Sequence, residues 1–86
     1  MPRISQFFGV VIAMYKNDHA SPYFHAEYAG EEATFVIESL EILAGRLPRR
    51  AQSLVLEWAS LHRTELSENW NLAREGLPLN EIAPLD

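Results

Sequence analysis

Two of the three histidines, His19 and His25, flank a short polar stretch in the first third of the chain. Imidazole nitrogens bind divalent metals and transfer protons near neutral pH. A zinc site needs three or four ligands in a tetrahedral array, so Asp18 or Glu27 would have to complete a site here. This spacing matches no fixed metal motif, and the alternative is that His19 caps the loop while His25 packs with its ring partly exposed. We therefore expect no cofactor, with a divalent metal at His19 and His25 left open.

The third histidine, His62, is followed three residues later by Glu65 in a segment with helical periodicity. Residues three, four and seven apart lie on one side of a helix, so His62, Glu65 and Asn69 are expected on the apolar side of this segment. A carboxylate beside an imidazole orients the ring for acid–base work, which makes His62 and Glu65 the candidate catalytic residues. If the helix instead breaks here, the same residues face solvent or cap a second helix. No serine or cysteine stands in a nucleophile motif, so covalent catalysis has no sequence support.

Three of the seven basic residues, Arg46, Arg49 and Arg50, fall within five positions where this helical segment begins. A helix N-terminus already carries partial positive charge, so arginines gain nothing from the helix dipole there. A bound anion would offset this cost, because guanidinium groups and free backbone N–H groups together bind phosphate or carboxylate. Salt bridges to Glu38, to Glu41 or to a partner protein are the alternative. The three arginines are the candidate anion-binding residues.

The composition is typical of a small globular domain. The chain has 86 residues, of which 48% are hydrophobic and 22% charged, and it contains no cysteine. A disulfide scaffold and a thiolate metal site are thereby excluded, and nothing indicates an oxidising compartment. The apolar run from Phe7 to Tyr15 is far shorter than the ~20 residues of a transmembrane helix. No signal-peptide cleavage site follows it, so we expect a cytoplasmic protein with no membrane partner.

The charge and the chain length limit the expected partners. The formal net charge is −5, whereas proteins that bind nucleic acid in general show a basic excess. Nucleic acid binding through a local arginine patch remains open. A core this small gains stability from a buried interface, so a homo-oligomer is open as well.

The first half of the chain has the patterns of a sheet. Residues 3–15 form a continuous apolar, β-branched and aromatic run that predicts a buried strand, with Gly9 marking a bulge or a close backbone approach. Residues 23–28 and 32–38 alternate and are joined by a short glycine-containing turn, which is typical of an antiparallel hairpin. Residues 40–43 are expected to add a brief further strand.

The second half changes period. From Pro48, apolar residues recur at three- and four-residue steps, which predicts an amphipathic helix that ends near Gly76. One helix of this length would be about twice the usual size, so a break near residues 63–67 is the alternative. The fold class is therefore α+β: a three- to four-stranded antiparallel sheet followed by one long or two shorter C-terminal helices packed on it. We expect a single domain of residues 1–86, with residues 3–44 mainly strands, 48–76 helical and 77–86 an extended tail that docks through Leu79, Ile82 and Leu85.

Blocks of residues along nearly the whole chain resemble those of one known family. They are Met1-Pro2-Arg3-Ile4-Ser5 with Phe8-Gly9, Met14-Tyr15, Asn17-Asp18-His19, Pro22, Phe24-His25-Ala26-Glu27-Tyr28, Gly45-Arg46-Leu47-Pro48-Arg49-Arg50-Ala51, Leu54-Val55-Leu56-Glu57-Trp58-Ala59, Leu61-His62-Arg63, Glu65-Leu66, Asn69-Trp70 and Ile82-Ala83-Pro84-Leu85. On these residues the chain resembles the small bacterial family called domain of unknown function 4160 (DUF4160). The family typically reads His-x-Pro-Pro-His-Phe-His around the first loop, where this chain has Tyr23 in place of the middle histidine and Ser21 in place of the first proline. A metal role for such a cluster would lack one ligand here.

The resemblance implies a partner more than a reaction. Such genes look like one half of a two-gene arrangement with another small family, DUF2442, and a toxin–antitoxin role has been suggested for such pairs. The first functional expectation is therefore an interaction module that binds a cognate small protein of that family. The alternatives are a small nuclease- or hydrolase-type enzyme, in which the histidines and Glu65 would act with the arginines on phosphate, and a structural or adaptor domain without chemistry. No catalytic residue follows from the resemblance itself.

Overall fold

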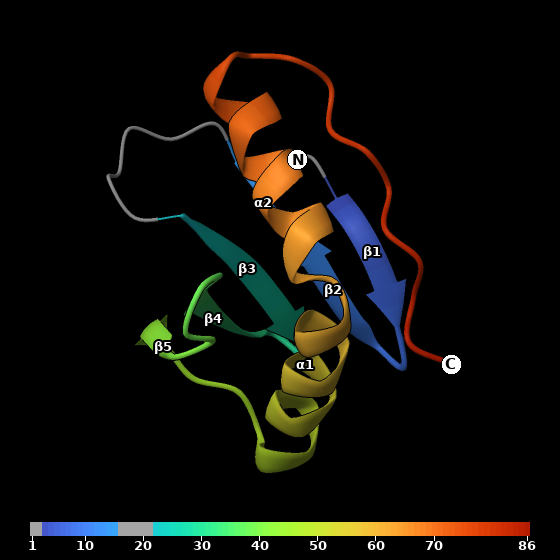
Figure 1. The fold of residues 1–86 in the computed structure, drawn as a ribbon. Coiled ribbons are helices and arrows are strands. Elements are labelled where there is room, and N and C mark those ends of the chain that lie inside the picture. Colours follow the sequence, from blue (N-terminus) through green and yellow to red (C-terminus); the bar gives the residue numbers. More distant parts are fainter. Residues whose placement is uncertain (1–2, 16–21) are drawn as a thin grey trace.

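The computed structural model describes residues 3–15 and 22–86, and it contains one antiparallel sheet with two helices on one side of it (Figure 1). The strands pair in chain order, β1-β2-β3-β4-β5. The elements are β1 (Arg3–Phe7), β2 (Val10–Ala13), β3 (Tyr23–Tyr28), β4 (Glu31–Val36), β5 (Ile42–Gly45), α1 (Arg49–Leu61) and α2 (Arg63–Arg74). The α+β class is confirmed, but the sheet has five strands rather than three or four. Neither helix of the described residues, with 13 residues in α1 and 12 in α2, could span a lipid bilayer.

The extra strand arises because the first apolar run turns back on itself. Phe8 and Gly9 connect β1 to β2 with φ angles of 48° and 84°, and two positive φ angles are the mark of a type I′ hairpin turn. The expectation of one strand over residues 3–15 was therefore wrong, and Gly9 lies in the turn between two strands rather than at a bulge within one. Ala29 and Gly30 form the same kind of turn between β3 and β4, with φ angles of 50° and 84°.

The last strand, β5, lies at the free edge of the sheet and runs to Gly45, two residues beyond the expected end. Thr34 pairs with Ala44 and Phe35 pairs with Ile42, so Leu43 is one extra residue on β5, which is a β-bulge. Gly45 has a φ of 74°, and a Cβ atom there would collide with the backbone of β4. Only glycine lets the chain pass so close to the neighbouring strand.

The helices cover the sheet through Trp58, which is fully buried on α1. Its ring centroid lies 5.4 Å from that of Phe7 and 6.1 Å from that of Phe24. The Phe24 ring stacks in turn on Phe35 of the next strand, with 5.3 Å between centroids. Side chains alternate along a strand, so His25 is directed to the other face of the sheet from Phe24. Tyr23, at the start of β3, still reaches α2, with its ring centroid 5.2 Å from that of Trp70.

The helical segment breaks at His62, whose φ and ψ of −127° and 26° are not helical. Two shorter helices result, as the second alternative predicted, and the break comes one residue before the expected range of 63–67. The His62 N–H donates to the Ala59 carbonyl at 3.1 Å, and the His62 carbonyl accepts from the Leu66 N–H at 2.9 Å. The junction thus provides partners for a donor and an acceptor that helix ends otherwise leave unpaired.

The tail after α2 runs beside β1 in the same direction (Figure 1). The Ile82 N–H donates to the Ile4 carbonyl at 2.8 Å, and the Ile82 side chain is buried. Leu79 and Leu85 pack partly buried against the core cluster, so the expected docking of the tail is observed.

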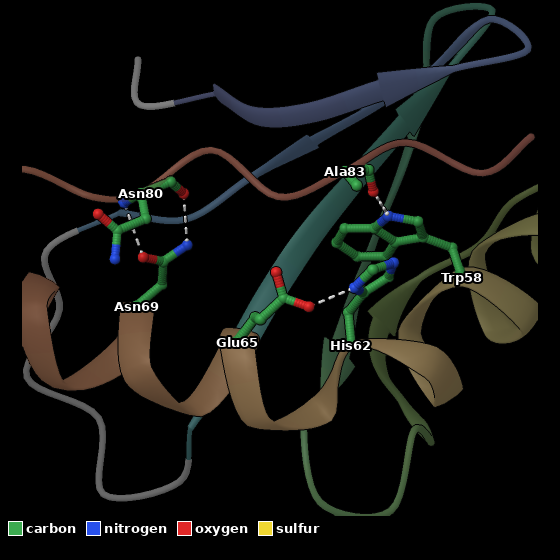
Figure 2. Close-up of polar contacts among 6 residues, drawn as sticks. All are labelled: Trp58, His62, Glu65, Asn69, Asn80 and Ala83. Carbon is green, nitrogen blue, oxygen red and sulfur yellow. Dashed lines mark hydrogen bonds and ion pairs between the residues drawn. The ribbon is translucent and has the colours of Figure 1, made fainter.

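Two polar side chains of the helices hold this tail, as Figure 2 shows. The Trp58 Nε1–H donates to the Ala83 carbonyl at 2.8 Å. The Asn69 amide makes two bonds to the backbone of Asn80: Nδ2 donates to its carbonyl and Oδ1 accepts from its N–H, both at 2.8 Å. Asn69 is fully buried, so its amide acts as a two-sided clamp rather than as a solvent-facing group.

We predict that Asn69→Ala lowers the free energy of unfolding by about 2 kcal/mol, because it leaves two backbone groups of Asn80 without partners. Asn71→Ala is the matched control, since Asn71 is exposed on the same helix and alanine favours helix. Urea denaturation of both variants measures the difference. Equal stability of the two variants would contradict the clamp.

Candidate functional site

The structure brings together the two predicted catalytic residues. His62 Nδ1 lies 2.5 Å from Glu65 Oε1, and the two side chains are 16% and 46% exposed. Both lie on the same side of the helices as Trp58 and Asn69 and are directed toward the tail (Figure 2). Glu65 is in the first turn of α2, where the helix dipole favours a carboxylate.

The geometry of this pair is compatible with acid–base catalysis, and the same contacts also hold the junction between the two helices. A carboxylate on Nδ1 fixes the ring and leaves Nε2 facing a substrate, as in general acid–base catalysis. No residue of the described chain bonds to Nε2. The His62 ring also lies 5.4 Å from the Trp58 ring, so the pair fastens the helix junction to the core. Catalysis by His62 and Glu65 stays a prediction.

His25 lies on the opposite face of the sheet from His62. It follows Phe24, whose ring contacts Trp58 on the helix side, so alternation directs His25 away from the helices. No hydrogen bond, ion pair or ring contact of the described residues joins the two imidazoles. The Tyr23 ring contacts both His25 and Trp70 of α2. His19 and Asp18 lie outside the described residues. Within the described ranges 3–15 and 22–86, no group of three or more His, Cys, Asp or Glu side chains could hold a metal ion.

The neighbours of His25 were missed by sequence reasoning. Its Nδ1 lies 3.2 Å from Thr34 Oγ1, and its ring lies 4.7 Å from that of Tyr15 and 5.3 Å from that of Tyr23. Burial lowers the pKa of His25, and the nearby Glu32 carboxylate acts in the opposite direction. Burial raises the pKa of Tyr15, and acidic neighbours, Glu32 foremost, raise it further. These contacts depend on strand register, which places His25 opposite Thr34 and Ala13.

The three arginines are exposed, and they surround the connection from β5 to α1. In the part of the chain that the structure describes, the ion pair is His62 with Glu65, and none involves Arg46, Arg49 or Arg50. The alternative of local salt bridges to Glu38 or Glu41 is therefore not observed there. Arg46 is held by its backbone, whose N–H donates to the Glu32 carbonyl at 3.2 Å.

The arginines and the His62–Glu65 pair are far apart. Arg50 is in the first turn of α1 and His62 directly follows its last residue, and at a rise of 1.5 Å per residue the two positions lie about 18 Å apart. One phosphate cannot contact both groups. The structure thus does not assemble the single centre in which His62 would act on a phosphate held by arginines.

A pocket that sequence reasoning missed lies between β1 and the tail. Its volume is about 230 Å³, and its lining includes Ser5, Gln6, Ile82 and Pro84. Ser5 is 8% exposed, and its hydroxyl has no hydrogen-bond partner among the described residues. Pro84 has no N–H, so it cannot extend the pairing of the tail with β1 that Ile82 begins. The pocket is the space left between β1 and the tail where this pairing stops. In the sequence, the signal for it is Pro84, two residues after Ile82, which docks the tail on β1.

The fold and these contacts define a small α+β domain whose polar groups lie in three separate places. The chain belongs to the family described as Domain of unknown function (DUF4160), which matches residues 9–71, more than half of its length. The match includes the arginines, His62 and Glu65, and it leaves out β1 and the tail. No curated protein and no solved structure matches the chain.

We predict that the stability of the protein falls as the pH drops below 6.5, the ordinary pKa of histidine. Because the pKa of His25 is lower in the folded chain, the unfolded chain takes up a proton first, and stability rises with pH across this window. Tyr15, Tyr23 and Glu32 lie near the His25 ring, and they are the same in the unchanged protein and in the variant His25→Gln. His25→Gln should show a smaller loss of unfolding free energy between pH 7 and pH 5 than the unchanged protein, measured by urea denaturation. An identical loss in both would show that His25 does not titrate in this way.

Proposed function

We propose that this protein is an interaction module, one component of a two-gene pair of toxin–antitoxin type that acts in the cytoplasm. It binds an acidic surface of a small cognate protein through Arg46, Arg49 and Arg50, here called the arginine group. The carrying observation is that these three exposed side chains have no acidic partner in the described chain, although the protein has a formal net charge of −5.

The physical argument is one of unsatisfied charge. Three like charges beside a helix N-terminus repel one another and the helix dipole. Carboxylates of a partner remove this cost and add bidentate hydrogen bonds to guanidinium groups. Opposite charge on the partner also speeds association and excludes wrong partners. The same three residues therefore serve both affinity and selectivity.

A protein partner fits this surface better than nucleic acid. Nucleic acids carry uniform negative charge, and their binding needs many phosphate contacts to overcome general repulsion. The chain carries 12 acidic against 7 basic residues, and only three of the basic ones are gathered here. The resemblance to DUF4160 supports the product of a neighbouring gene, of the DUF2442 family, as the partner.

We expect the triple variant Arg46→Ala, Arg49→Ala, Arg50→Ala to bind the neighbouring gene's product about tenfold more weakly, since ion pairs of exposed side chains contribute ~0.2–1 kcal/mol each. Isothermal titration calorimetry at two salt concentrations measures this, and higher salt should weaken binding of the unchanged protein. The control is Arg63→Ala with Arg74→Ala, because both arginines are exposed on α2. The control should bind normally.

Two results would overturn this function. One is absence of binding between the two unchanged proteins. The other is a triple variant that binds as tightly as the α2 control. A single-stranded oligonucleotide that binds in place of the neighbouring protein, with loss in the triple variant, would assign the arginine group to nucleic acid instead.

A further inference from the structure

We infer that the partner presents an acidic segment carrying an apolar side chain, which is recognised by side chains along residues 43–50 and not by strand addition to β5. This inference rests on the proposed function and adds the chemistry of the ligand. It follows from Leu43, from the interrupted edge of β5 and from the order of charges along this stretch.

Residues 43–50 connect the end of β5 to the start of α1. Every residue in the range is exposed except Leu47, which is buried in the core cluster. Leu43 itself is 56% exposed. A single exposed leucine is ordinary on a protein surface. This one lies on the bulge three residues before Arg46, so one ligand segment can contact both.

The backbone of this surface is held in place before any ligand binds. The Arg46 N–H is bonded to β4, the Leu47 side chain is in the core, and the Gln52 N–H donates to the Pro48 carbonyl at 2.9 Å. A surface ordered in advance loses less conformational entropy on binding. The backbone that carries the arginine group is thus already ordered in the free protein and does not have to become ordered when the ligand binds.

The edge of β5 does not offer a continuous ladder for an added strand. The bulge at Leu43 adds one unpaired residue, and bulges at sheet edges interrupt pairing with further chains. Gly45 follows two residues later with a φ of 74°, which is far from the extended geometry of a strand. Recognition here must therefore come from the side chains.

The order of charges specifies the ligand further. Glu38 and Glu41 are exposed just before β5, and the arginine group follows it. A phosphate backbone, negative along its whole length, meets repulsion at one end of this stretch. A short segment with carboxylates at one end and an apolar side chain over Leu43 meets none. An acidic peptide segment fits the surface, and a nucleic acid strand does not.

The first test compares two exposed leucines. Leu43→Ser should weaken binding of the neighbouring gene's product roughly five- to tenfold, as expected for loss of one buried aliphatic contact. Leu77→Ser, on the exposed start of the tail, should leave binding unchanged. If Leu43→Ser binds normally while the arginine triple variant does not, the inference fails and the proposed function stands. If the unchanged proteins do not bind each other, the proposed function itself fails.

The second test uses synthetic peptides and charge reversal. A peptide with glutamates at one end and a leucine at the other should shift the amide NMR signals of residues 43–50. The variant Arg49→Glu with Arg50→Glu should instead bind the analogue in which lysines replace the glutamates. Amide exchange at Leu43 and Gly45 should be unchanged by the bound partner protein. Strong protection of both amides would show strand addition, and a response to an oligonucleotide but not to the peptide would show nucleic acid binding. Either result overturns the inference.

Discussion

The placement of Trp58 is the interaction on which the rest of this structure depends. Its indole is fully buried, its ring packs on Phe7 and Phe24, and its N–H bonds to the carbonyl of Ala83. One side chain thus joins a helix, the sheet and the tail. Trp58 fixes the orientation of α1 about its own axis. His62 and Asn69, which follow it in the chain, therefore face the tail, whereas Arg49 and Arg50 at the start of α1 are exposed to solvent.

The same placement explains why polar residues occur on an otherwise apolar helix side. A buried polar group without a partner costs about 1–3 kcal/mol, so each one needs a specific contact. Asn69 is hydrogen-bonded to the backbone of Asn80, and His62 is hydrogen-bonded to Glu65. The polar stripe is accounted for by tail docking and by the helix junction, whereas the exposed arginines have no such internal explanation. This contrast is why the proposed function rests on the arginines.

The sequence predicted the elements more reliably than their connections. The hairpin of β3 and β4, the helical half and the docking tail follow from periodicity and from Leu79, Ile82 and Leu85. The turn at Phe8 and Gly9 was missed because phenylalanine rarely adopts a positive φ, so a continuous apolar run hid a reversal. The break at His62 carries neither glycine nor proline, and only the local packing of the ring places it.

The candidate site was predictable only where it was local. His62 and Glu65 are three residues apart, so helical spacing alone brings them together. The neighbours of His25 lie on other strands, and their identity depends on a register that the sequence does not give. The separation of His62 from the arginines follows from the length of α1, whereas placing His25 relative to His62 required knowing which face of the sheet the helices cover.

Hydrogen exchange at the indole N–H of Trp58 tests this account most directly. Trp58 should exchange as slowly as the most protected core amides, because its N–H is buried and bonded to the tail. NMR of the full chain resolves its indole signal from that of Trp70. Exchange of the Trp58 indole at the rate of a solvent-exposed tryptophan would contradict the central claim that this residue joins helix, sheet and tail.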